Sequence, residues 1–94
     1  MDLKYTYLFD YYGELFTEKQ KDYFKDYYFN NLTLQEIADN NNVSRNTVHK
    51  NIKEILNKLD YYESKLSLYS NKKKIIKLLD EVDEDVKKQI EELI

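Results

Sequence analysis

The chain has 94 residues, which is enough for one small domain and too few for two independent hydrophobic cores. It contains no cysteine, which excludes disulfides, thiolate metal sites and cysteine nucleophiles, and its net charge of −3 excludes a chain-wide basic surface for nucleic acid. Because it has no proline and a single glycine, Gly13, a sheet with tight turns is disfavoured and an all-α fold is predicted.

The amino-terminal stretch MDLKYTYLFD carries an acid where a signal peptide carries basic residues. No apolar run along the chain reaches membrane-spanning length. We therefore expect a cytoplasmic protein that does not insert into a membrane, and the absence of cysteine is consistent with a reducing compartment.

The first predicted helix covers about residues 2–12. Apolar and aromatic side chains recur in it at helical spacing: Leu3, Tyr7, Leu8, Tyr11 and Tyr12. Gly13 follows at the position where a glycine often ends a helix. Thr17 and Gln20 then form a capping box, in which each side chain satisfies a backbone amide that the helix start leaves unpaired.

The capping box begins a second predicted helix with an apolar stripe of Phe24, Tyr27 and Tyr28. Tyr23 lies on the margin of this stripe, and the asparagine pair at 30–31 ends the helix. We expect most of the tyrosines to line the core with their hydroxyls at its rim.

A helix-turn-helix pattern occupies about residues 33–56. Such a motif needs a small residue where its helices cross, a residue that tolerates positive φ in the turn, and apolar anchors on both sides. Ala38 meets the first need and Asn42 the second. The residues predicted to build the motif are Thr33, Ile37, Ala38, Asn42, Val43, Val48 and Ile52.

Two capping signals stand where the helices of this motif should begin. Thr33 with Glu36 forms a second capping box, and Ser44 is placed to cap the following helix. That helix is predicted to run to about Leu66, with apolar side chains along one arc: Val48, Ile52, Ile55, Leu56 and Leu59.

The opposite, polar face of this helix is the candidate for reading nucleic acid. Arginine, lysine and asparagine can bond to base edges, and a helix N-terminus with a serine cap can hold a phosphate. The candidate binding residues are Ser44, Arg45, Asn46, His49, Lys50 and Lys53. The alternative is an ordinary solvated helix face, which the helix-turn-helix context makes the weaker interpretation.

The charge of this segment differs from that of the whole chain. From Ser44 to Lys58, four basic residues stand against the single acid Glu54, a local charge of +3 (four minus one). A nucleic-acid interface would therefore be confined to this basic patch.

The carboxy-terminal segment is predicted to form one amphipathic helix, capped by Ser70 or Asn71. Its apolar stripe comprises Ile75, Leu79, Val82, Val86, Ile90 and Leu93. The stripe either closes the core of its own domain or joins a second copy, as a homodimer through residues 72–94. We accordingly divide the chain into a helix-turn-helix domain at 1–70 and an amphipathic helix at 71–94, part of that domain or a dimerisation arm.

The remaining polar groups do not form a catalytic or metal-binding pattern. His49 is the only histidine, and the acidic run at 80–85 lacks the central glycine and ligand alternation of a calcium loop. We expect no metal, no cofactor and no enzymatic activity. Tyr61 and Tyr62 are the tyrosines best placed by sequence to stack on unpaired bases.

Several of these stretches together resemble the YlxM family of small bacterial proteins, from about residue 8 to 68. The most distinctive are LFDYYG at 8–13, LFT with KQ at 15–20, VSR at 43–45, and YE with KL at 62–66. The central part of that family is similar to the promoter-reading helix-turn-helix of sigma factors. The resemblance implies an all-α bundle of about five helices.

Members of the YlxM family are typically encoded beside the GTPase subunit of the signal recognition particle. The resemblance therefore implies an accessory or regulatory role in that targeting pathway, through the particle's RNA or its GTPase subunit. Four positions on or near the predicted reading face depart from the family pattern: the pair Asn46-Thr47, Lys50 after His49, and Glu54.

Three functions remain open from the sequence. The first is a non-catalytic accessory protein of the targeting pathway that binds nucleic acid or the ribonucleoprotein. The second is a DNA-binding transcription regulator of sigma-domain type. The third is a module that binds only protein, because the chain as a whole is acidic.

Overall fold

The computed structural model describes residues 3–93, and all the regular secondary structure in that part of the chain is helical. Seven elements follow one another in chain order: α1 (Leu3–Tyr12), the 3₁₀-helix η1 (Gly13–Leu15), α2 (Glu18–Tyr28), α3 (Leu34–Asn41), α4 (Arg45–Leu66), α5 (Leu68–Leu79) and α6 (Glu84–Glu91). The predicted all-α fold with a helix-turn-helix is confirmed. Residue 2, with which the first helix was predicted to begin, lies outside the described residues.

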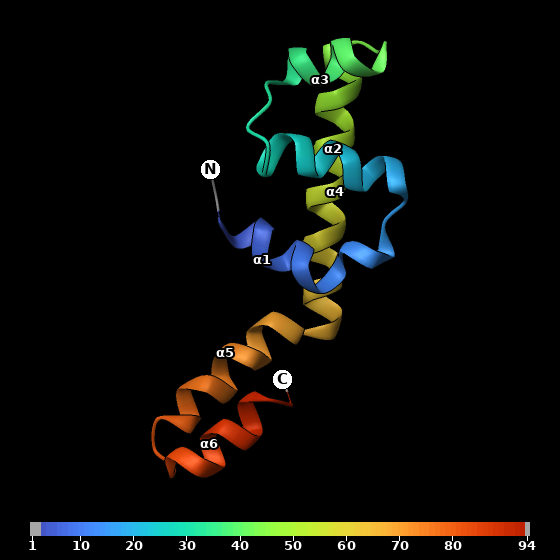
Figure 1. Cartoon of the computed structure of the whole chain (residues 1–94). Coiled ribbons are helices and arrows are strands. Elements are labelled where there is room, and N and C mark those ends of the chain that lie inside the picture. Colours follow the sequence, from blue (N-terminus) through green and yellow to red (C-terminus); the bar gives the residue numbers. More distant parts are fainter. Residues whose placement is uncertain (1–2, 94) are drawn as a thin grey trace.

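The long helix α4 is the axis of the molecule (Figure 1). The three helices α1, α2 and α3 all pack against it, and α5 and α6 form a hairpin at its carboxyl end. The molecule is therefore elongated, with extents of 54 × 25 × 21 Å.

The hydrophobic core lies between α4 and the first three helices. Its buried side chains are Leu8, Phe9, Tyr12, Phe16, Tyr23, Phe24, Ile37, Ala38, Val48, Ile52, Ile55 and Leu59. The predicted arc of α4 is thus buried, with Leu56 half-buried at its edge. Burying such apolar side chains contributes about 1.5–3 kcal/mol each, which is the main stabilisation available to a domain of this size.

A stack of aromatic rings joins α1 to α2 within this core. Phe9 stacks on Phe24 with ring centroids 4.1 Å apart, and Phe24 stacks on Tyr28 at 4.5 Å. This stack determines which face of α1 is buried. Phe9, absent from the predicted stripe, is buried, whereas Leu3 and Tyr7 in that stripe are exposed.

Two further details of α1 and α2 correct the predictions. Gly13 does not end α1 in a left-handed conformation, because the chain passes directly into η1 and the described glycine has no positive φ. A Cβ at Gly13 would lie 3.2 Å from the Phe9 ring, so the glycine makes room for that ring. Tyr23, predicted at a margin, is buried at 4% exposure.

The carboxy-terminal segment is two helices and not the single predicted one. The predicted cap at Ser70 or Asn71 is wrong, since Ser67 turns the chain with φ 53° and α5 begins at Leu68. A second break follows α5, and Asp83 caps α6 by accepting a hydrogen bond from the Asp85 amide at 2.9 Å.

The acidic run at 80–85 explains the second break. Negative side chains are unfavourable at the carboxyl end of a helix and favourable at its start. Glu84 and Asp85 lie in the first turn of α6, where their charge is favourable. As a result the predicted apolar stripe is not a continuous buried surface: Leu79 is buried, whereas Val82 and Val86 are exposed.

A hydrogen-bonded junction fixes the direction of α5. The Tyr12 hydroxyl donates to Glu63 Oε1 at 2.7 Å and accepts from the Leu68 amide at 3.1 Å. The Glu63 carboxylate also accepts from the amides of Tyr69 and Ser70, both at 3.2 Å. Burial, and then the hydrogen bond to Glu63, raises the pKa of the Tyr12 hydroxyl.

Candidate nucleic-acid interface

The turn between α3 and α4 has the geometry of a helix-turn-helix. Asn42 adopts φ 56° and ψ 42°, the left-handed conformation that asparagine tolerates better than most residues. The following amide, that of Val43, donates to the Ala38 carbonyl at 3.1 Å. This bond satisfies a backbone carbonyl near the end of α3, and the chain changes direction over the three residues 42–44 before α4 begins at Arg45.

Both helices of the motif begin with the predicted caps. Thr33 Oγ1 accepts from the Glu36 amide at 3.1 Å, and the Thr33 amide donates to Glu36 Oε1 at 3.0 Å. Ser44 Oγ accepts from the Thr47 amide at 3.1 Å. Because α3 has only eight residues, such caps matter for its stability, at about 1 kcal/mol each.

Buried side chains hold α3 and α4 at a fixed angle. Ile37, Ala38 and Val48 are fully buried between the two helices, and Val43 packs against the same core. The small side chain of Ala38 lets the helices approach closely. A bond from Lys19 Nζ to Asn41 Oδ1 at 2.7 Å also ties the end of α3 to α2.

The predicted reading residues all lie in the solvent-exposed part of α4 or at its cap: Ser44, Arg45, Asn46, His49, Lys50 and Lys53. The Ser44 hydroxyl caps the helix and lies 2.9 Å from Thr47 Oγ1, so it is engaged within the protein. The amides of Arg45 and Asn46 are the backbone donors that point out of the start of the helix.

The basic side chains of this face have no carboxylate partner within residues 3–93. Every ion pair formed in that range joins other residues, and Arg45, Lys50 and Lys53 belong to none. Their positive charge is therefore available to a ligand. The single acid of the segment, Glu54, is exposed on the same helix.

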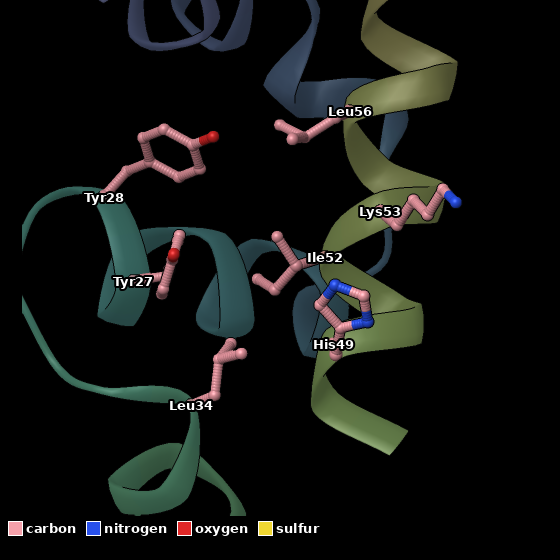
Figure 2. Close-up of a pocket in the computed structure, with 7 residues that line it drawn as sticks. All are labelled: Tyr27, Tyr28, Leu34, His49, Ile52, Lys53 and Leu56. Carbon is pink, nitrogen blue, oxygen red and sulfur yellow. The ribbon is translucent and has the colours of Figure 1, made fainter. Parts of the chain in front are cut away.

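Two clefts adjoin one side of this face. The first, of about 210 Å³, lies between the end of α2, the start of α3 and the middle of α4. Figure 2 shows Tyr27 and Leu34 on one side of it and Ile52 and His49 on the other. The second, of about 240 Å³, continues toward the start of α4 and shares Leu34 and His49 with the first.

Sequence reasoning missed these clefts because three separate helices form them. The spacing of Tyr27 and Leu34 shows only an apolar stripe and the start of a helix. The tyrosines that the sequence favoured for stacking lie elsewhere: Tyr61 is exposed, but Tyr62 is half-buried with its ring against Tyr12 and Phe16.

Residues 1–94 match a family model described as "Putative helix-turn-helix protein, YlxM / p13 like", the UPF0122 family. The chain belongs to this family. The predicted family resemblance is thereby confirmed, and it extends over the α5–α6 hairpin as well as the helix-turn-helix.

Curated UPF0122 proteins from several bacteria are similar over most of the chain. A UPF0122 protein of Fusobacterium nucleatum is 46% identical over 88 residues, covering 93% of this chain and 85% of the relative. One of Malacoplasma penetrans is 41% identical, covering 92% of this chain and 86% of the relative. One of Halalkalibacterium halodurans is 44% identical, covering 93% and 80%.

Two other kinds of functional feature, a membrane-spanning helix and a metal site, were sought among the described residues. No helix in the range 3–93 is both long and apolar enough to cross a membrane. The same range contains no cluster of histidine, cysteine and acidic side chains that could hold a metal ion.

Proposed function

We propose that this UPF0122 protein is a non-catalytic regulator that binds nucleic acid through the exposed face of α4. The observation that carries the proposal is the unpaired positive charge of Arg45, Lys50 and Lys53 on the second helix of a fully formed helix-turn-helix. On DNA, the second helix of this motif enters the major groove, and its first turns contact bases and phosphates.

The chemistry of this face fits such a role. Arg45 and Asn46 lie in the first turn of α4, where arginine can bond a guanine edge and asparagine an adenine edge. Lys50 and Lys53 follow along the same exposed surface and suit phosphate oxygens. His49 lies between these two groups and can contact either.

We further propose that this nucleic acid belongs to the signal recognition particle, so that the protein acts in the cytoplasm as an accessory of that pathway. The support is the resemblance to YlxM proteins, whose genes typically neighbour that of the particle's GTPase subunit. The GTPase subunit is then a second candidate partner. A sigma-type transcription regulator is the main competing function.

One set of binding measurements separates these functions. The full chain is titrated against the particle's RNA, its GTPase subunit and promoter duplexes over a salt series. We expect tightest binding to the particle's RNA, with a logarithm of affinity that falls steeply with the logarithm of salt, since each neutralised phosphate contributes a slope of about −0.7 to −0.9.

The variant Lys50→Glu with Lys53→Glu tests the face itself. It should weaken RNA binding by more than tenfold and reduce the magnitude of the salt slope by about 1.4–1.8, because two phosphate contacts are lost. The matched control is Lys25→Glu with Lys65→Glu, which changes the net charge equally at exposed positions outside the predicted reading face and outside residues 72–94. Equal effects of the two pairs would refute binding through this face of α4.

We also propose that the exposed hairpin of α5 and α6 joins two copies of the chain through residues 72–94. Ile76, Leu78 and Val86 expose 39%, 66% and 45% of their surface. Lysines dominate residues 72–77 and acids dominate 80–85, so two antiparallel hairpins would pair opposite charges. Light scattering should give a dimer for the native chain and a monomer for Leu78→Glu, and a monomer in both would refute this arm.

A further inference from the structure

The cleft between α2, α3 and α4 combines an aromatic and apolar wall with a polar outer edge. Tyr27, Leu34 and Ile52 form its inner wall, and His49 and Lys53 lie at its α4 side (Figure 2). It continues into the second cleft, lined by Arg45 and by the same Leu34 and His49. The two clefts together form a groove along one flank of the reading face.

The two tyrosines of the cleft differ in how far their rings are committed to the core. The Tyr28 ring is half-buried, and one of its faces is covered because it stacks on the buried Phe24 ring with a centroid distance of 4.5 Å. The Tyr27 ring is half-buried, and its ring contact within the described residues is an edge contact with Tyr28 at 5.3 Å. Tyr27 is therefore the aromatic surface that the cleft offers to a ligand.

The charges of the residues that line the clefts indicate which kind of aromatic ligand would bind there. None of the described residues that line the two clefts is acidic, whereas Arg45, His49 and Lys53 are basic. A flat aromatic group attached to a phosphate matches this arrangement: the ring faces the tyrosine and the phosphate faces the cations.

A base within a duplex cannot reach this wall, because it is paired and stacked between its neighbours. Unpaired bases in RNA loops and bulges are free to stack on aromatic side chains. The position of the cleft beside α4 places such a base next to a stem that the helix would hold.

We propose that this cleft receives one unpaired base of an RNA whose adjoining stem binds along α4, with Tyr27 as the stacking surface. The inference rests on the proposed nucleic-acid binding by α4 and specifies its ligand as a stem with an unpaired base. His49 lies opposite Tyr27 at the cleft, and Lys53 and Arg45 lie where the phosphates on either side of that base would pass.

The test uses two RNA hairpins of the same stem, one fully paired and one with a single bulged 2-aminopurine. The chain has no tryptophan, so the fluorescence of this base analogue can be excited selectively. We expect tighter binding of the bulged hairpin and quenching of its fluorescence on binding, since stacking on an aromatic ring quenches the analogue.

Variants of Tyr27 identify the stacking surface. Tyr27→Leu, which keeps an apolar side chain and removes the ring, should lose about tenfold in affinity for the bulged hairpin, lose the quenching, and leave the paired hairpin unaffected. Tyr27→Phe should retain both properties. Tyr61→Leu, at an exposed tyrosine farther along α4, is the matched control, and circular dichroism verifies that each variant is folded.

The outcomes distinguish the two proposals. If neither hairpin bound, or if the lysine variants of α4 had no effect, nucleic-acid binding by α4 would be refuted. If both hairpins bound equally through α4, without quenching and without a specific effect of Tyr27→Leu, only the base cleft would be refuted. If an apolar peptide displaced the bulged base but not the stem, the proposal of a base-binding cleft would be refuted in favour of a protein ligand.

Discussion

Replacing Glu63 by alanine removes the acceptor that joins α4, α1 and α5. The carboxylate accepts three hydrogen bonds, from the Tyr12 hydroxyl at 2.7 Å and from the amides of Tyr69 and Ser70 at 3.2 Å each. The two amides belong to the first turn of α5, which has no side-chain cap from Ser67. In its place, Glu63 serves as the cap of that helix.

The expected loss of stability follows from the number and kind of these hydrogen bonds. A hydrogen bond to a charged group contributes about 1.5–3 kcal/mol, and a lost helix cap costs about 1 kcal/mol. Glu63 is only half-buried, so solvent compensates part of the loss and we expect Glu63→Ala to lower the free energy of unfolding by about 2–3 kcal/mol. For a domain of this length that corresponds to a fall in Tm of roughly 10–20 °C.

The assay is urea unfolding followed by circular dichroism, with Glu54→Ala as the matched control. Glu54 is an exposed glutamate of the same helix and forms no ion pair within residues 3–93. Glu63→Gln keeps an acceptor without the charge and should lose about half as much. In the double variant with Tyr12→Phe, the losses should fall short of additivity, because the two side chains share one bond.

A loss of stability for Glu63→Ala no greater than that for Glu54→Ala would refute the role of Glu63 as the cap of α5. Additive losses for Glu63→Ala and Tyr12→Phe would also contradict it, since they would mean that the two groups stabilise the fold independently.

Three further predictions concern the turn, a cap and the effect of pH. Asn42→Val should lower the stability by about 1–2 kcal/mol, because a β-branched residue is strained at φ 56°, whereas Asn42→Gly should leave it equal or slightly higher in the same unfolding assay. Thr33→Ala should cost about 1 kcal/mol and Thr33→Ser much less, since serine restores the bond to the Glu36 amide; equal losses would contradict the cap. The raised pKa of Tyr12 means that the folded chain holds this proton more tightly than the unfolded chain does, so its contribution to stability is complete below about pH 10 and is lost as pH rises through the folded pKa. Alkaline urea titrations should therefore show a shallower decline for Tyr12→Phe than for the native chain, and identical slopes would refute the assignment.

The helix-turn-helix was predictable in detail because its determinants are local. Both capping boxes connect residues three positions apart, and Asn42 adopts its conformation within a single residue. The apolar period of α4 likewise defines the face that must be buried, whatever it packs against. These features need no knowledge of the rest of the fold.

The carboxy-terminal helices were predictable only in part. The apolar period continues from Ile75 to Leu93 and indicates one helix, but period alone does not report where a helix is interrupted. Ser67 in a left-handed conformation and Asp83 as a cap place the breaks. A serine with positive φ is uncommon. The hydrogen bonds from the Tyr69 and Ser70 amides to Glu63 fix the start of α5 and so hold Ser67 in this conformation.

The sequence by itself therefore determined the all-α class, the position of the helix-turn-helix and the helix face that carries Arg45, Lys50 and Lys53. Only the tertiary structure decided that Phe9 is buried on Phe24, that Glu63 both caps α5 and accepts from Tyr12 across 51 residues, and that Tyr27 lines a cleft beside α4. The physical reason is the range of each interaction. Caps, turns and apolar periods act within a few residues of chain, whereas ring stacks, shared carboxylates and clefts exist only after separate helices have packed together.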